Sequence, residues 1–369
     1  SSNYGLALTS NATSSNKCRA WFSCHNVYFV VGYRSTNGIE PYYTYQTYGV
    51  GNGGTAYLSD YTGQLTVCKE LASYASTVNP FSLELVYNSS YAMRYGEENY
   101  DAGSWLGLGM HVGAGVNLSI MQRVEKIELQ NDSNANNKST YMKYTDGDGT
   151  IHYFAKDSSK DANYYYDEDG MGLKINEYRT GCYMISDDKD NEMYFVNGFL
   201  TLINDANGNE IQIHYTHSDG TSASNGYPNA SGDRISKIVQ KNTGGSAITV
   251  ATFAYNSSNW LSSITDAAGN VYNFTYSSGK LTKISRGSTV LAQYGAASTR
   301  MSYAYDAEAK YGVAFTYDAG KVSSYYEITS ASTAAKPGAI VEVGHLENGQ
   351  TLYRDYGSDR SRSDNDILT

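Results

Sequence analysis

The feature that most constrains this chain is an internal repeat in its C-terminal half. Residues 199–215 align without a gap with residues 260–276. The coinciding pairs are Leu200/Leu261, Ile203/Ile264, Asp205/Asp266, Gly208/Gly269, Asn209/Asn270 and Tyr215/Tyr276. Each copy reads as a short apolar strand, a polar turn and a second strand that ends in tyrosine. Such a unit cannot bury its apolar face alone, so it must stack on its neighbours.

A finer unit of about twenty residues recurs in the same region, which is a length typical of repeat arrays. The triplets Phe253-Ala-Tyr255, Phe274-Thr-Tyr276 and Phe315-Thr-Tyr317 each precede a turn and a short apolar strand. The order strand, turn, strand, turn therefore continues through most of the C-terminal half.

The composition favours strands joined by hairpin turns. The chain has 37 Tyr against 9 Phe and 3 Trp, and 36 Gly against 4 Pro. Tyrosine suits half-buried strands, and glycine is frequent in tight turns. Residues 144–154 and 166–173 each read as strand, Asp-Gly turn and strand, which is a strong hairpin signal. We predict an all-β fold of consecutive antiparallel hairpins that form a curved, spiralling sheet.

We divide the chain into three parts on this pattern. Residues 1–38 are interpreted as the last strands of an upstream β-sandwich module or as a linker. Residues 39–196 form a β-rich region before the repeats, and residues 197–369 form an open repeat array that is truncated at its C-terminus. Only residues 67–76 have a pattern compatible with a helical turn or two. No apolar run approaches the length of a membrane span.

The repeat residues carry a family resemblance. Asp266-Ala-Ala-Gly-Asn270, then Phe274-Thr-Tyr276 and Gly279-Lys-Leu-Thr-Lys-Ile284, resembles the YD repeat of Rhs proteins, teneurins and bacterial wall-associated proteins. Other stretches that resemble Gram-positive members are residues 33–45, 54–65 and 86–88 before the repeats, and residues 353–368 at a link into further repeats. The similarity extends over about residues 30–369.

The resemblance implies a long strip of β-sheet wound into a hollow shell. In polymorphic-toxin members the shell encloses a C-terminal toxin, and in other members it displays adhesive surfaces. The chain is therefore expected to be a structural segment of a secreted or cell-wall-associated bacterial protein. Its expected partner is the rest of its own polypeptide, namely further repeats and a C-terminal effector. The chain departs from the full pattern because it has no recognisable self-cleaving core motif and no toxin.

The first alternative is an adhesin or glycan-binding surface, with a cell-surface glycan or protein as partner. The candidate ligand-binding residues are Tyr164, Tyr165, Tyr166, Tyr325 and Tyr326. Exposed aromatic rings suit sugar binding, but aromatic side chains on strands also pack as cross-strand pairs. Nucleic acid is not an expected partner, because the net charge is −10 and no Lys/Arg cluster is present.

The second alternative is a carbohydrate-active enzyme. Residues 167–169 supply neighbouring carboxylates, and a glycosidase needs two of them about 5–9 Å apart. The six histidines form no His-Glu-x-x-His motif, and no Gly-x-Ser-x-Gly motif is present. We therefore expect that the chain is not an enzyme and assign no catalytic residue.

Calcium is the metal that the acidic turns would suit. Asp146 and Asp148 place hard oxygens close together, as do residues 187–190 and 364–366. None of these segments fits the twelve-residue EF-hand loop, and hairpin turns use the same residues. We expect no cofactor, with Asp146 and Asp148 as the calcium candidates.

Cys18, Cys24, Cys68 and Cys182 allow three disulfide pairings. Cys18 and Cys24 could staple a hairpin, but free cysteines are also commonly buried. The pairing stays open at this point.

Overall fold

The computed structural model describes residues 38–74, 80–93, 108–130, 136–217, 219–223, 226–228, 232–333, 340–345, 351–355 and 366–368. Most of these residues lie in antiparallel strands of two sheets, which confirms the predicted all-β fold. The strands expected in residues 1–37 lie outside the described part of the chain. None of the helices within the described ranges is long and apolar enough to cross a membrane.

The smaller sheet is five-stranded and follows chain order. Its strands are β1 (Tyr45–Gly49), β2 (Thr55–Ser59), β3 (Leu65–Tyr74), β4 (Phe81–Asn88) and β5 (Val116–Leu118). A 3-10 turn, η1 (Gly51–Gly53), joins β1 to β2, and a short helix, α1 (Ser89–Met93), follows β4.

The helical turn considered for residues 67–76 is wrong for the described part of that segment, because residues up to Tyr74 belong to β3. Pairing along β4 satisfies the backbone there, and the register shifts between Glu70 and Ala72. This irregularity disturbs the alternation of apolar and polar residues that would otherwise have indicated a strand.

The larger sheet contains every remaining strand. Its first strands are β6 (Arg123–Gln130), β7 (Lys138–Thr145), β8 (Ile151–Ala155), β9 (Tyr164–Asp167), β10 (Lys174–Arg179), β11 (Cys182–Ser186), β12 (Glu192–Val196) and β13 (Phe199–Asn204). The middle strands are β14 (Glu210–Thr216), β15 (Arg234–Lys241), β16 (Ala247–Tyr255), β17 (Leu261–Asp266), β18 (Val271–Ser277), β19 (Lys280–Arg286) and β20 (Thr289–Ala297). The last are β21 (Arg300–Asp306), β22 (Tyr311–Asp318), β23 (Lys321–Ile328), β24 (Ile340–His345), β25 (Thr351–Asp355) and β26 (Asp366–Leu368).

Strands β6 to β13 close into a ring, because β13 pairs back with β6 through Phe199 and Arg123. One apolar side chain from most of these strands fills the interior of the ring. They are Val124, Met142, Phe154, Ile175, Ile185 and Phe195, each at most 1% exposed. The boundary predicted between residues 196 and 197 lies between β12 and β13, which pair within the same sheet. The change from the smaller to the larger sheet comes earlier, between β5 and β6.

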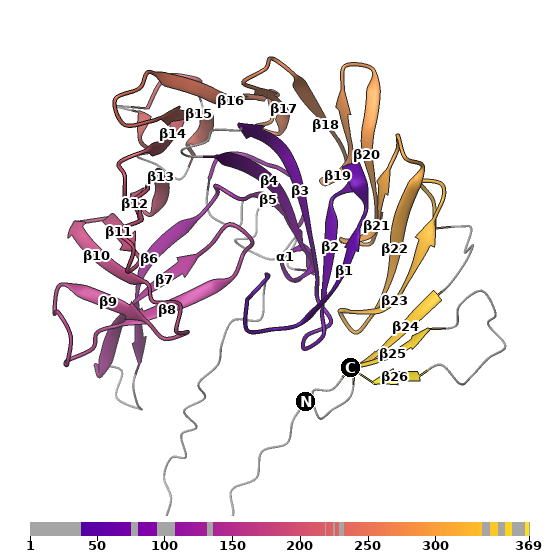
Figure 1. Ribbon diagram of the computed structural model, residues 1–369, viewed down its shortest axis with the longest axis horizontal. Coiled ribbons are helices and arrows are strands. Elements are labelled where there is room, and N and C mark those ends of the chain that lie inside the picture. Colours follow the sequence, from indigo (N-terminus) through magenta and orange to yellow (C-terminus); the bar gives the residue numbers. More distant parts are fainter. Residues whose placement is uncertain are drawn as a thin grey trace, which may run out of the picture.

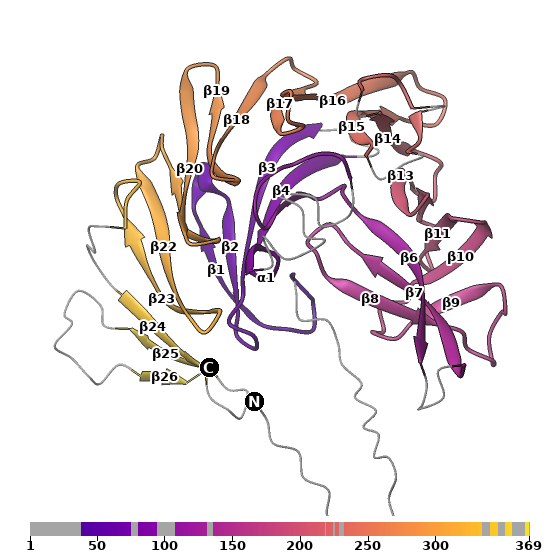
Figure 2. The same ribbon diagram turned by 180° about the vertical axis from the view of Figure 1, so that it is seen from behind.

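Strands β14 to β26 continue from the ring as a curved band, and the five-stranded sheet lies inside the curve (Figures 1 and 2). A single hydrophobic core connects both sheets. It includes Leu83 and Leu85 from the smaller sheet and Leu261 and Ile264 from the band. The band is therefore not a free-standing strip, because its inner face is covered.

One extra residue interrupts alternate strand pairs of the array. In the β18–β19 pair, the partner on β19 steps from Leu281 to Lys283 as the ladder passes Tyr276. Thr282 is the extra residue, which defines a β-bulge. The equivalent residues in other pairs are Thr201, Ser236, Ser262, Ser302 and Ser323. The bulge explains the Leu-x-x-Ile spacing, because it turns residues three apart toward the same buried face.

The hydroxyl groups at several bulges bond to the opposite strand. The Oγ atoms of Thr201, Ser236 and Thr282 donate to the backbone carbonyls of Tyr194, His214 and Thr275 at 3.0, 3.1 and 3.0 Å. A short hydroxyl side chain therefore suits this position, since it bonds locally to the disrupted backbone.

A tyrosine hydroxyl then links each bulge to the following hairpin. Tyr276 donates to the backbone carbonyl of Leu261 at 2.9 Å, directly before the bulge residue Ser262. The equivalent bonds join Tyr215 to Leu200 at 2.7 Å, Tyr255 to Ile235 at 2.7 Å and Tyr317 to Met301 at 2.8 Å. The ring fills the core while the hydroxyl supplies a donor to buried backbone beside an interrupted ladder. In each of these four cases, a tyrosine of one unit donates a hydrogen bond to the backbone of the unit before it. We call this series of hydrogen bonds the tyrosine–bulge relay.

Two units vary the relay. In β20 the equivalent position is Ala296, and Tyr294 donates instead to the carbonyl of Gly53 at 3.2 Å. In β24 His345 takes the tyrosine's role, because its Nε2 lies 3.0 Å from the carbonyl of Val322 and must donate to it. A missing tyrosine at Ala296 explains why the triplets in the sequence skip one unit.

The hairpin turns at one rim of the array are tied to residues that precede the array in sequence. The bonds run from Val124 N to Gly198 O (2.8 Å), Gly109 N to Asp233 O (2.9 Å), His111 N to Asn259 O (2.9 Å) and Ala114 N to Gly279 O (2.9 Å). Further along, Met301 N donates to Tyr87 Oη (2.8 Å) and Val322 N donates to Gly63 O (2.8 Å). The region before the repeats therefore sets the path of this rim.

The relay predicts a measurable cost for losing one hydroxyl. Tyr276→Phe keeps the ring but leaves the Leu261 carbonyl without its donor, so we expect a loss of about 1–3 kcal/mol in the free energy of unfolding. Tyr61→Phe is the control, because Tyr61 is 55% exposed, and we expect a change within about 0.5 kcal/mol. Urea denaturation measures both, and equal effects of the two substitutions would contradict the relay.

Candidate functional site

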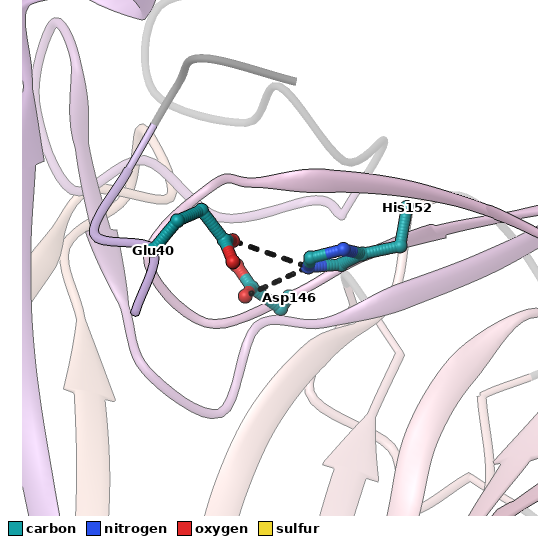
Figure 3. A group of neighbouring side chains, drawn as sticks. All are labelled: Glu40, Asp146 and His152. Atoms are coloured by element: carbon teal, nitrogen blue, oxygen red, sulfur yellow. Dashed lines mark hydrogen bonds and ion pairs between the residues drawn. The ribbon is translucent and has the colours of Figure 1, made fainter. Parts of the chain in front are cut away.

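A group of ionisable side chains gathers where three segments of the chain meet (Figure 3). Glu40 precedes β1, Asp146 lies in the turn between β7 and β8, and His152 lies on β8. One ligand atom from each lies within 4.8 Å of the other two. Asp169, from the loop between β9 and β10, contacts the far side of His152. This group is the candidate functional site.

The turn Asp146-Gly-Asp-Gly-Thr150 positions the first carboxylate. Asp146 Oδ1 accepts the backbone N–H groups of Asp148, Gly149 and Thr150 at 3.1, 3.0 and 2.9 Å. Because one oxygen caps the turn, the other oxygen is directed at His152.

The second aspartate of the turn holds the incoming chain. Asp148 Oδ2 accepts the backbone N–H of Ile39 at 2.7 Å, and its Oδ1 accepts Thr150 Oγ1 at 2.7 Å. The backbone N–H of Glu40 donates to Tyr45 Oη at 2.7 Å. These bonds fix the backbone that presents Glu40 to the site.

The imidazole of His152 is held from three sides. Its Nδ1 lies 3.0 Å from Asp169 Oδ2, and its ring stacks on Tyr144 with centroids 5.8 Å apart. Its Nε2 lies 3.4 Å from Asp146 Oδ2 and 3.5 Å from Glu40 Oε1. Only 2% of the side chain is exposed.

The members of the site shift one another's pKa values. Burial raises the pKa of Glu40. Burial and the neighbouring Asp146 raise the pKa of Asp148 to about 8. Burial lowers the pKa of His152, but the hydrogen bonds and charges of Asp146, Asp169 and Glu40 outweigh it and raise the pKa to about 9. The site therefore concentrates negative charge around one imidazole, and a cation or bound protons must balance it.

This arrangement suits cation binding. The Nε2 atom and two carboxylate oxygens converge from the segment before β1 and from the β7–β8 hairpin, and Asp169 contacts the opposite side of the imidazole. Among the calcium candidates, Asp146 faces the site with one oxygen, whereas both oxygens of Asp148 accept hydrogen bonds from the chain. The sequence therefore indicated one member of the group. Glu40 and Asp169 were missed because only the fold brings them to this turn, whereas His152 lies in the predicted hairpin but belongs to no motif that marks it as a ligand.

The tyrosines predicted to bind ligand lie in different surroundings. Tyr165 and Tyr326 are buried, 9% and 2% exposed, and pack in the hydrophobic cores. Tyr164 and Tyr166 are partly exposed, and the ammonium groups of Lys174 and Lys160 lie over their rings at 4.8 and 4.4 Å. Tyr325 contacts Tyr48, with ring centroids 4.4 Å apart. Ligand binding by this set stays a prediction.

A pocket that the sequence did not indicate lies between β10, β12 and β13. It encloses about 400 Å³, and its lining includes Tyr178, Tyr194, Tyr227, Arg179 and Asn197. Tyr178 and Tyr194 meet edge to face at 6.0 Å. The three tyrosines come from separate segments of the chain, so no local sequence motif indicates this pocket.

The remaining candidates have structural roles in the described residues. Both oxygens of Asp167 accept backbone N–H groups, from Met171 at 2.6 Å and from Leu173 at 2.9 Å. Residues 187–191 form a hairpin turn in which Asp187 accepts from Lys189 and Asn191. Cys68 and Cys182 are free thiols, and burial raises the pKa of Cys68 to about 12. Cys18 and Cys24 lie outside the described residues.

No family model and no curated protein matches this chain. Among solved structures, the chain is similar to one in a Photorhabdus luminescens Tc holotoxin pore that carries a TccC3 mutation. The identity is 11% and the TM-score 0.31, over 85% of this chain and 15% of that one. It is also similar to a chain of a TcdB2-TccC3-Cdc42 structure, with 9% identity and a TM-score of 0.27, over 85% of this chain and 17% of that one. The chain therefore spans less than a fifth of the length of either of these chains.

Close packing beside the site predicts that replacing Gly38 destabilises the fold. Its φ is +79°, and an added Cβ would overlap Asp148 Oδ1 and Thr150 Oγ1. Gly269 is the matched control, because its φ is +83° and nothing lies within 4 Å of an added Cβ. We expect Gly269→Ala to cost about 1–2 kcal/mol for its left-handed backbone, and Gly38→Ala to cost about 1–3 kcal/mol more. Urea denaturation compares them, and equal costs would argue against the close contact with Asp148.

Proposed function

We propose that this chain is a structural segment of a secreted or cell-surface repeat protein of the Rhs/YD type. In this proposal the hairpins build part of a β-shell that encloses or displays a C-terminal effector. The chain's partner is then the rest of its own polypeptide, and its role is mechanical rather than catalytic.

The observation that carries the proposal is the tyrosine–bulge relay along the curved band. The same bond recurs from Tyr215 to Tyr317, and His345 continues it in β24. Because most hairpins of the array supply a donor to the hairpin before them, the sheet extends by adding like units in chain order. Repeated addition of similar hairpins produces an extended sheet, which can serve as the wall of a shell.

The five-stranded sheet inside the curved band is a second observation in favour of the proposal. The five-stranded sheet lies on the concave side (Figure 1) and shares the hydrophobic core of the band. The segment that leads into its strand β5 bonds successive hairpin turns at one rim of the band through Gly109, His111 and Ala114. The band thus curves around the five-stranded sheet, and this sheet supports the curvature that a shell wall needs.

Protease protection in the full-length polypeptide tests the enclosing role. A site-specific protease sequence is placed in the segment that follows the repeats, and a control sequence is placed in the turn at residues 243–246, which is exposed. We expect rapid cleavage at the control turn and resistance of the following segment until the protein is denatured. Equal cleavage rates at the two positions in the native protein would contradict an enclosing shell.

The tyrosine pocket favours a second candidate function, the binding of a saccharide. Three tyrosine rings, Arg179 and Asn197 line a pocket of about 400 Å³, and pockets of about this volume bind small ligands through apolar walls with a few polar groups.

A glycan array tests this candidate. If the pocket binds sugar, Tyr178→Ala abolishes the signal while Tyr61→Ala, on another exposed tyrosine, preserves it. The absence of any signal from the wild type, or a signal that survives Tyr178→Ala, would contradict saccharide binding in this pocket.

A further inference from the structure

We propose that Glu40, Asp146 and His152 bind a divalent transition-metal ion, with zinc as the best-fitting ion. This inference concerns the site between the two sheets and does not depend on the shell role. It is carried by the spacing of the donor atoms, the orientation of the imidazole and the burial of the group.

The donor spacing matches a tetrahedral ion. His152 Nε2 lies 3.4 Å from Asp146 Oδ2 and 3.5 Å from Glu40 Oε1. These separations exceed the usual hydrogen-bond range of about 2.7–3.2 Å. Zinc bonds of about 2.0–2.2 Å place tetrahedral ligands about 3.3–3.6 Å apart. The two distances are therefore compatible with ligands around one tetrahedral ion.

The imidazole is oriented as in metal sites. A histidine that binds metal usually donates its other ring N–H to a carboxylate, which fixes the tautomer and directs the free nitrogen at the ion. Asp169 Oδ2 lies 3.0 Å from His152 Nδ1 and fills this role. Asp169 is thus a positioning residue, whereas Glu40, Asp146 and His152 are the ligands.

The donor set selects among metals. Calcium takes six to eight oxygen ligands, while imidazole nitrogen favours zinc and its neighbours in the transition series. Asp148 is not a further ligand in this proposal, because both of its oxygens accept hydrogen bonds from Ile39 and Thr150. Three protein ligands leave a fourth position for water or another donor.

A bound ion would join distant parts of the chain. Glu40 belongs to the segment that leads into the five-stranded sheet, and the other two ligands belong to the β7–β8 hairpin of the larger sheet. An ion that binds the folded chain and not the unfolded chain stabilises the fold. The proposed metal ion would therefore cross-link the two sheets and act as a metal clasp between them.

Zinc titration of the chelator-treated full chain tests the proposal. We expect one equivalent of Zn²⁺ to bind, measured by calorimetry, and the thermal midpoint to rise with Zn²⁺ concentration. His152→Gln and Glu40→Gln should each weaken binding at least about tenfold, and Asp169→Asn should weaken it by about 10–100-fold. Co²⁺ in place of Zn²⁺ should give visible absorption bands of a four-coordinate ion, and His152→Gln should abolish or shift them.

His217→Gln is the matched control. His217 Nδ1 also bonds an aspartate, Asp233, at 2.8 Å, but it belongs to no such three-ligand group within the described residues. Its variant should bind zinc like the wild type. Failure of the wild type to bind one equivalent would overturn the proposal, as would equal binding by all variants, which places the zinc elsewhere, for example at cysteines. If His152→Gln does not fold, Glu40→Gln and Asp169→Asn, which preserve side-chain shape, decide the outcome.

Discussion

A tyrosine hydroxyl bonded to the backbone beside a bulge is the interaction on which the array depends. The bulge lets residues three apart, such as Leu261 and Ile264, enter the same core, and it bends the strand. It also interrupts the ladder, which is costly in a buried place unless a partner is supplied. The tyrosine of the next hairpin supplies that partner and fills the core with its ring. Curvature, burial and order along the chain thus follow from one repeated contact.

The region before the repeats also helps to hold the hairpins of the band in place. Its backbone meets successive turns at one rim of the band, from Gly109 at the Asp233 carbonyl to Gly63 at the Val322 amide. The glycine at 109 is required because an added Cβ would overlap the carbonyl of Gly232. The inner sheet and the band therefore share one core and one set of rim contacts, and the proposed metal clasp lies where the chain enters this assembly.

The all-β class and the hairpin repeat could be predicted, because tyrosine-ended strands and polar turns are local patterns. The closure of the ring through Phe199 and Arg123 could not be predicted from the sequence, because a single long-range residue pair makes it.

The strand at residues 67–74 was missed because a register shift hides the alternation of its apolar and polar residues. Within the candidate site, Asp146 was visible in an acidic turn. Glu40 lies too far away in sequence for any spacing rule to connect it with that turn.

The exchange rate of individual tyrosine hydroxyl protons tests the central claim most directly. NMR of selectively labelled tyrosine in the native chain measures this rate for each ring. We expect slow exchange for Tyr215, Tyr255, Tyr276 and Tyr317, whose hydroxyls donate to backbone carbonyls, and fast exchange for Tyr61. Fast exchange at those four positions would contradict the relay and the wall built upon it.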